Sequence, residues 1–166
     1  MILIGFMGAG KSTIARLLGK ELRRPFIDID TEIEKNLEMS ISEYFAQRGE
    51  TAFRQIELEV LKLALTTERI ISTGGGCIET AEVRSLLKER QDVIFLRGSF
   101  DLLYERVTRE DVASLRPIVN QKTKSELAAL YESRLGYYQE VAQITIDTDD
   151  LTPIEIVEEI QQLVHN

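Results

Sequence analysis

The chain has 166 residues, of which 43% are hydrophobic, and it carries 28 Asp and Glu against 20 Lys and Arg. This length and composition favour a single domain that buries its own core without disulfide support. The net charge of −8 excludes nucleic acid and anionic membranes as general partners, because such a chain repels phosphate groups on average.

The chain begins with the apolar run MILI, which is too short for a signal peptide or a membrane-spanning helix. Cys77 is the only cysteine, so no internal disulfide forms and nothing favours an oxidising compartment. We therefore expect a cytoplasmic protein, with Cys77 as a small buried residue. A small anionic ligand held by a few arginines is compatible with this charge.

Short β-branched runs alternate with longer stretches of helical periodicity along the chain. These runs predict strands at residues 2–4, 26–29, 70–73, 93–96 and 144–146. Capping pairs predict three helix starts: Ser40 with Glu43, Thr123 with Glu126, and Thr152 with Glu155. The alternation predicts an α/β fold with a parallel sheet that helices cover on both faces.

The first predicted strand runs directly into GFMGAGKST, residues 5–13. Gly5, four residues and then Gly10-Lys11-Ser12 match the phosphate-binding loop pattern in its strand–loop–helix context. Backbone N–H groups at the helix start can face phosphate oxygens, while Lys11 reaches the β- and γ-phosphates and Ser12 ligates Mg²⁺. The alternative is a glycine-rich turn with an incidental lysine, which this context disfavours.

The second predicted strand ends in FIDIDTEIE, with Asp28 and Asp30 two residues apart. On a strand this spacing puts both carboxylates on one side, at the edge of the sheet where α/β folds bind ligands. One can hold a metal through water while the other orients or deprotonates a hydroxyl. Alternatively, Asp30 only caps the next helix. The guanine-reading motif of signalling GTPases is missing from the sequence.

Later segments supply arginines and a glycine run. TAFRQIE contains Arg54, ISTGGG ends the third predicted strand, SLRPIV contains Arg116, and YESRLGYY contains Arg134. Three glycines at a strand end let backbone N–H groups approach a ligand, although a tight turn needs glycine as well. Each arginine alone is more often a solvated surface residue than a ligand contact. The polar stretch 108–124 reads as a mobile insertion.

Together, GFMGAGKST, FIDIDTEIE, FRQIE, STGGG, LRPIV and SRLGYY resemble the shikimate kinase family in order and spacing, over essentially the whole chain. The resemblance implies one three-layer α/β domain, 1–166, with a P-loop kinase fold and a five-stranded parallel sheet. It implies a substrate-binding helical region at about 31–60 and a lid at about 109–122. It also implies a monomer that uses ATP and Mg²⁺ to phosphorylate the 3-hydroxyl of shikimate, a step toward chorismate and the aromatic amino acids.

The resemblance also assigns roles to individual positions. The catalytic residues correspond to Lys11, Asp30 and Arg116, where Arg116 is the lid arginine. The metal residues correspond to Ser12 and to Asp28, which acts through water. The nucleotide-binding residues correspond to Gly8, Ala9, Gly10, Lys11, Ser12, Thr13, Arg109, Arg116 and Pro153. The substrate-binding residues correspond to Asp30, Arg54, Gly75, Gly76 and Arg134.

One departure concerns the adenine side, where family members often carry basic residues after the last strand. In this chain that segment is DTDDLTP, with Leu151 in place of an arginine. Two other functions stay open at this point. One is another small-molecule kinase of the same group, such as a gluconate kinase or a nucleotide kinase, and the other is a non-catalytic nucleotide-binding module.

Overall fold

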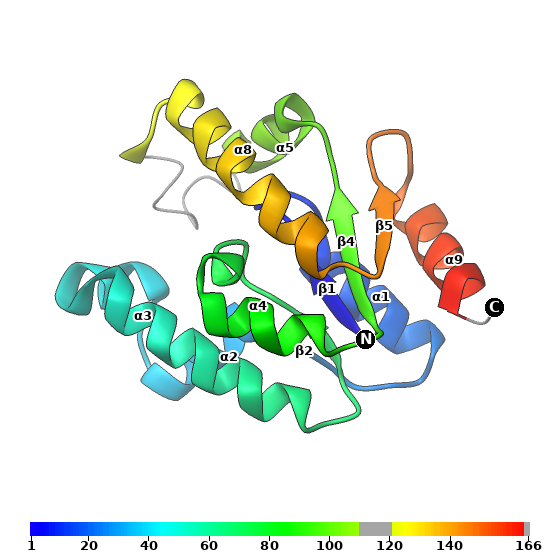
Figure 1. Cartoon of the computed structure of the whole chain (residues 1–166), viewed down its shortest axis with the longest axis horizontal. Coiled ribbons are helices and arrows are strands. Elements are labelled where there is room, and N and C mark those ends of the chain that lie inside the picture. Colours follow the sequence, from blue (N-terminus) through cyan, green and yellow to red (C-terminus); the bar gives the residue numbers. More distant parts are fainter. Residues whose placement is uncertain (110–120, 165–166) are drawn as a thin grey trace.

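The computed structural model describes residues 1–109 and 121–164 (Figure 1). Its sheet has five parallel strands in the order β2-β3-β1-β4-β5. The strands are β1 (Ile2–Ile4), β2 (Phe26–Asp28), β3 (Ile70–Ser72), β4 (Val93–Arg97) and β5 (Ile144–Asp147). The predicted five-stranded parallel sheet is therefore confirmed, and the strand boundaries differ from the predicted ones by no more than one residue.

Helices form the layers on either side of this sheet. They are α1 (Lys11–Glu21), α2 (Ile29–Leu37), α3 (Ile41–Leu65), α4 (Ala81–Lys88), α5 (Phe100–Thr108), α8 (Lys124–Val141) and α9 (Pro153–Val164). The 3₁₀ turn η1 (Cys77–Glu79) follows β3. Helix α1 packs against α9, α4 packs against α8, and the α2–α3 pair lies beside the edge strand β2 (Figure 1).

The central strands are apolar because helices cover both faces of the sheet. Every residue of β1 is fully buried, and so are the apolar residues of β4. Parallel sheets covered on both faces have such continuous apolar strands. All three predicted capping pairs are present, so the helix starts at Ser40, Thr123 and Thr152 are confirmed.

The end of β2 differs from the prediction. The strand stops at Asp28, whose carboxylate accepts a hydrogen bond from the Thr31 N–H (3.2 Å) and so caps α2. Asp30 therefore lies in the first helical turn and not on the strand. The period-two argument for Asp30 is wrong, and so is the alternative that Asp30 is the cap, because the Asp28 carboxylate starts the helix two residues earlier.

The structure describes all of the predicted substrate-binding region, 31–60, but only part of the predicted lid, 109–122. Residues 31–60 comprise most of α2, the turn at 38–40 and the first part of α3, and α3 is interrupted at Gly49, which has a φ of 79°. Of the predicted lid, 109–122, residues 110–120 lie outside the described part of the chain, and Arg116 is among them.

Two glycines offer a matched test of the backbone geometry. Gly5 has a φ of +148°, and a Cβ there would lie 2.6 Å from the Leu96 carbonyl oxygen, whereas a Cβ on Gly136 of α8 meets nothing within 4 Å. Gly5→Ala should therefore lower the free energy of unfolding by about 2 kcal/mol or more. Gly136→Ala should raise it by up to about 1 kcal/mol. Urea unfolding of both variants measures these free energies. Equal changes in the two variants would contradict the prediction.

Candidate active site

The phosphate-binding loop joins β1 to α1 and depends on backbone conformations that favour glycine. Gly8 has a φ of 82° and Gly10 a φ of 86°. Gly10 is the N-cap of α1 and offers no side chain to the helix N–H groups. Such an uncapped helix start can bind an anion, because its N–H groups and the helix dipole favour negative charge. The loop has the geometry that the sequence predicts for phosphate.

Lys11 places a positive charge inside this loop. Its side chain is largely buried, and its Nζ donates hydrogen bonds to the carbonyl oxygens of Gly5 (2.8 Å) and Phe6 (3.0 Å). These carbonyls partly compensate the cost of burying an ammonium group. The lysine is thus held over the loop backbone, beside the start of α1.

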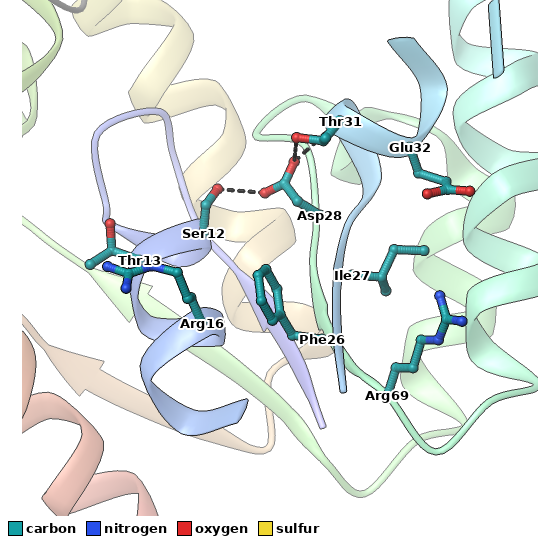
Figure 2. Close-up of a pocket in the computed structure, with 9 residues that line it drawn as sticks. All are labelled: Ser12, Thr13, Arg16, Phe26, Ile27, Asp28, Thr31, Glu32 and Arg69. Atoms are coloured by element: carbon teal, nitrogen blue, oxygen red, sulfur yellow. Dashed lines mark hydrogen bonds between the residues drawn. The ribbon is translucent and has the colours of Figure 1, made fainter. Parts of the chain in front are cut away.

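Ser12 and Asp28 form the predicted metal pair. The Ser12 hydroxyl donates to Asp28 Oδ2 at 2.5 Å, and Figure 2 shows the two side chains pointing toward each other. The hydroxyl of Ser72, a buried residue at the end of β3, lies 3.4 Å from the Ser12 hydroxyl. Sequence reasoning missed Ser72, because a serine ending an apolar strand gives no distinct signal.

The oxygen donors of Ser12 and Asp28 suit Mg²⁺, which prefers hard oxygen ligands and is commonly held with substrate phosphates. Among residues 1–109 and 121–164, no group of three or more His, Cys, Asp or Glu side chains could hold a metal. At sites of this kind, phosphate oxygens and waters complete the coordination of Mg²⁺. The pair also lines a cavity of about 430 Å³ between α1 and β2, where Arg16, Phe26 and Arg69 lie (Figure 2).

Two arginines from distant helices meet beside the triple glycine. Arg54 comes from α3 and Arg134 from α8, and both contact Glu79 at the end of η1. Arg134 Nε donates to Glu79 Oε1 at 3.1 Å, and Arg54 Nη2 lies 3.7 Å from Glu79 Oε2. The Arg134 side chain is only 4% exposed, and the Arg54 side chain is 17% exposed. The structure thus brings together the two arginines that the sequence assigned to substrate.

Glu57 is a buried carboxylate next to Arg54. Arg54 Nη1 donates to Glu57 Oε2 at 2.7 Å, and the Glu57 side chain is 1% exposed. Burial raises the pKa of Glu57 to about 7, and the charge of Asp30 adds to this rise, whereas Arg54 opposes it. Burial alone would lower the Arg54 pKa, but Glu57 and two other carboxylates raise it. Glu57 stands in the FRQIE motif, yet its burial is a tertiary effect that the motif does not show.

The triple glycine makes room for these charged groups. A Cβ on Gly74 would lie 2.5 Å from Glu57 Oε1 and 2.8 Å from Asp30 Oδ1. A Cβ on Gly76 would overlap the Arg54 guanidinium. Neither glycine has a positive φ, so turn geometry does not require glycine at these positions. Glycine is needed because charged side chains lie where a Cβ would be.

Gly75 and Cys77 complete this segment. The Tyr138 hydroxyl donates to the Gly75 carbonyl oxygen, which fixes the strand end against α8. Cys77 is fully buried, and burial raises the pKa of its thiol to about 12. A neutral, enclosed thiol is a poor nucleophile, so Cys77 serves packing, as the sequence predicted.

The predicted adenine residues lie at the ends of two helices. Arg109 follows α5, is largely exposed and pairs with Glu105 at 3.7 Å, while Pro153 begins α9. The acidic segment before Pro153 has partners of its own. Asp147 accepts two hydrogen bonds from Arg97, at 2.5 and 2.7 Å.

The chain is similar to known proteins over almost its whole length. The family model described as shikimate kinase matches residues 7–165. The chain belongs to the shikimate kinase family. A shikimate kinase of Enterococcus faecalis is 43% identical over 162 residues, covering 98% of this chain and 96% of the relative. One from Lactococcus lactis subsp. lactis is 45% identical over the same shares of both chains.

Solved structures support the same family. A shikimate kinase from Acinetobacter baumannii in complex with shikimate aligns with a TM-score of 0.92 and 35% identity, covering 99% of this chain and 91% of that one. A gluconokinase from Sinorhizobium meliloti aligns with a TM-score of 0.56 and 18% identity, over 99% of this chain and 93% of that one. The second match shows a shared fold alone. Within the described residues, no helix has the length and apolarity needed to cross a membrane.

The raised pKa of Glu57 predicts a pH-dependent stability. Between its ordinary pKa of 4.5 and its folded pKa of about 7, the folded chain binds a proton that the unfolded chain has released. The contribution of this carboxyl group to the free energy of unfolding is therefore largest below pH 4.5. It falls by up to about 3 kcal/mol as the pH rises to about 7. In urea unfolding from pH 5 to 8, the free energy of unfolding of the wild type should decline with pH. The decline should be smaller for Glu57→Gln.

Glu59→Gln is the matched control, because Glu59 is an exposed residue of the same helix. It should leave the pH profile of the wild type unchanged. A Glu57→Gln profile parallel to that of the wild type would show that Glu57 titrates normally, and would contradict a pKa raised by burial.

Proposed function

We propose that this chain transfers the γ-phosphate of ATP to the 3-hydroxyl of shikimate, giving shikimate 3-phosphate and ADP. The observation that carries the proposal is the pair of shielded arginines, Arg54 and Arg134, beside Asp30 and the triple glycine. A phosphate loop is common to many enzymes, whereas this arginine pair suits an acceptor with a carboxylate. Membership of the shikimate kinase family supports the same acceptor.

The nucleotide side of the reaction uses the loop and the start of α1. Residues 8–13 would surround the triphosphate, with N–H groups from the loop and the positive charge of Lys11. Phosphate oxygens would replace the two backbone carbonyls that Lys11 now contacts. Ser12 and Asp28 would hold Mg²⁺, which neutralises the charge that develops on the phosphates. Arg109 and Pro153 would contact the adenine.

The acceptor side uses Asp30. Its carboxylate lies beside Gly74 at the strand ends, near the phosphate loop, and can accept the proton of the 3-hydroxyl. The hydroxyl oxygen then forms a bond to the γ-phosphorus while the bond from that phosphorus to the ADP oxygen breaks. The backbone at Gly75 and Gly76 would line the acceptor, and Arg116 would approach the transferred phosphate. All these residues belong to one chain, so a monomer is sufficient, and we place this monomer in the cytoplasm.

A gluconate kinase is the competing acceptor hypothesis, since that fold is shared. Gluconate also carries a carboxylate, so charge alone does not separate the two. The discriminating property is the rigid ring of shikimate, which fixes the distance between its carboxylate and its 3-hydroxyl. Arg134 and Asp30 lie on different rigid elements, α8 and α2, and this arrangement suits a fixed distance better than a flexible chain.

An ADP-release assay with shikimate, gluconate and AMP as acceptors tests the proposal. Shikimate should be preferred by a factor of roughly 10³ or more in kcat/KM. Its neutral amide should be a poor acceptor, because it lacks the charge and the two equivalent oxygens that a carboxylate offers to guanidinium groups. Lys11→Ala serves as the inactive background control. Equal rates with gluconate would favour the competing hypothesis.

Arg134→Lys sharpens the same assay, because it keeps the charge and loses the planar fork. It should raise the KM for shikimate by roughly tenfold or more and leave the KM for ATP unchanged. Arg90→Lys, at an arginine paired with Asp92 in the α4–β4 turn, is the matched control. Equal weakening of ATP and shikimate by Arg134→Lys would count against a carboxylate clamp.

A further inference from the structure

Glu79 carries a carboxylate that no role in the proposed reaction explains. It ends η1, three residues after the triple glycine, and its two oxygens contact different arginines. Oε1 accepts from Arg134 Nε at 3.1 Å, while Oε2 lies 3.7 Å from Arg54 Nη2. One carboxylate thus bridges the two guanidinium groups that the acceptor carboxylate would need.

Both arginines already have carboxylate partners in the structure without substrate. Arg54 also contacts Glu57 at 2.7 Å and Glu50 at 3.3 Å, so three protein carboxylates surround it before any substrate arrives. An acceptor carboxylate would add a further negative charge to this cluster. Like charges at such short range repel, so a carboxylate that occupies the guanidinium groups must give way to the carboxylate of the acceptor.

Glu79 is the carboxylate best placed to withdraw. Its side chain is 33% exposed, whereas that of Glu57 is 1% exposed and has no room to turn toward solvent. Glu50 is exposed too, but its ion pair is with Arg54, so its departure would not clear Arg134. Glu79 alone among these three touches both guanidinium groups.

The backbone of Glu79 is fixed even though its side chain can turn toward solvent. Arg84 Nη1 donates to the carbonyl oxygens of Ile78 (2.8 Å) and Glu79 (3.0 Å), and this anchors η1 to α4. Rotation about the side-chain bonds would therefore release both arginines without moving the triple glycine. Only rotamer changes are required, and these are fast compared with turnover.

We propose that Glu79 is an internal competitor for the acceptor: its carboxylate occupies Arg54 and Arg134 until the substrate carboxylate replaces it. The inference rests on the proposed function. In the empty site Glu79 pairs a buried guanidinium that would otherwise lack its counter-charge, and it keeps small inorganic anions out. The cost is a lower apparent affinity, because only the fraction of molecules with Glu79 withdrawn can bind substrate. Glu79 therefore sets affinity and selectivity and takes no part in the chemical step.

Glu79→Gln tests the inference in the intact enzyme. It should lower the KM for shikimate by about threefold to tenfold, with kcat and the KM for ATP unchanged. Sulfate should become a stronger competitive inhibitor against shikimate by a similar factor, because the arginine pair then stands open to small anions. A structural role alone would not tighten the binding of two different anions.

Thermal unfolding gives an independent measurement. Without ligand, Glu79→Gln should unfold at a lower temperature than the wild type, because Arg134 loses its charged partner. Saturating shikimate should raise the unfolding temperature of Glu79→Gln by more than it raises that of the wild type. Glu82→Gln is the matched control, since Glu82 pairs with Lys62 at 2.5 Å outside the site, and it should match the wild type in every measurement.

The outcomes separate the two proposals. If the wild type phosphorylates shikimate and Glu79→Gln has an unchanged or higher KM, the internal competitor is wrong and the proposed function stands. If the wild type does not phosphorylate shikimate, the proposed function fails and this inference falls with it. Should Glu79→Gln not fold, Glu79→Asp keeps the charge on a shorter side chain and should also lower the KM, and an unchanged KM there would overturn the inference.

Discussion

A buried guanidinium needs a carboxylate beside it, and the pairing of Arg54 with Glu57 meets this need at the carboxyl edge of the sheet. Other features of the site depend on it. Gly74 must lack a side chain because Glu57 and Asp30 fill that space, and Gly76 must lack one because of Arg54. The pair also ties the second half of α3, past the break at Gly49, to the strand ends.

The strand ends bring the two reacting sides together. β1 leads into the phosphate loop, β2 into Asp28 and the first turn of α2, and β3 into the triple glycine, and these three strands are neighbours in the sheet. Anion-binding N–H groups, oxygen ligands for a cation and a carboxylate for a hydroxyl proton therefore meet at one edge. Arg134 reaches this edge from α8, and Phe6 of the loop lies beneath its guanidinium at 5.7 Å.

Local patterns in the sequence predicted much of this arrangement. The central strands β1, β3 and β4 could be predicted because their apolar residues are buried, and the helix starts could be predicted because Ser40, Thr123 and Thr152 cap by short-range hydrogen bonds. Asp30 was misplaced because the competing cap, Asp28, ended the strand early. The sequence does not show the Glu79 bridge or the burial of Glu57, since both depend on contacts between η1, α3 and α8 that only the packed fold creates.

The central claim is that the arginine pair receives the carboxylate of the acceptor. A crystal structure of this chain with shikimate, without nucleotide, tests it most directly. We expect the shikimate carboxylate between Arg54 and Arg134, its 3-hydroxyl within hydrogen-bond distance of Asp30, and the Glu79 side chain turned toward solvent. Shikimate bound elsewhere, with Glu79 still bridging the two arginines, would contradict the account.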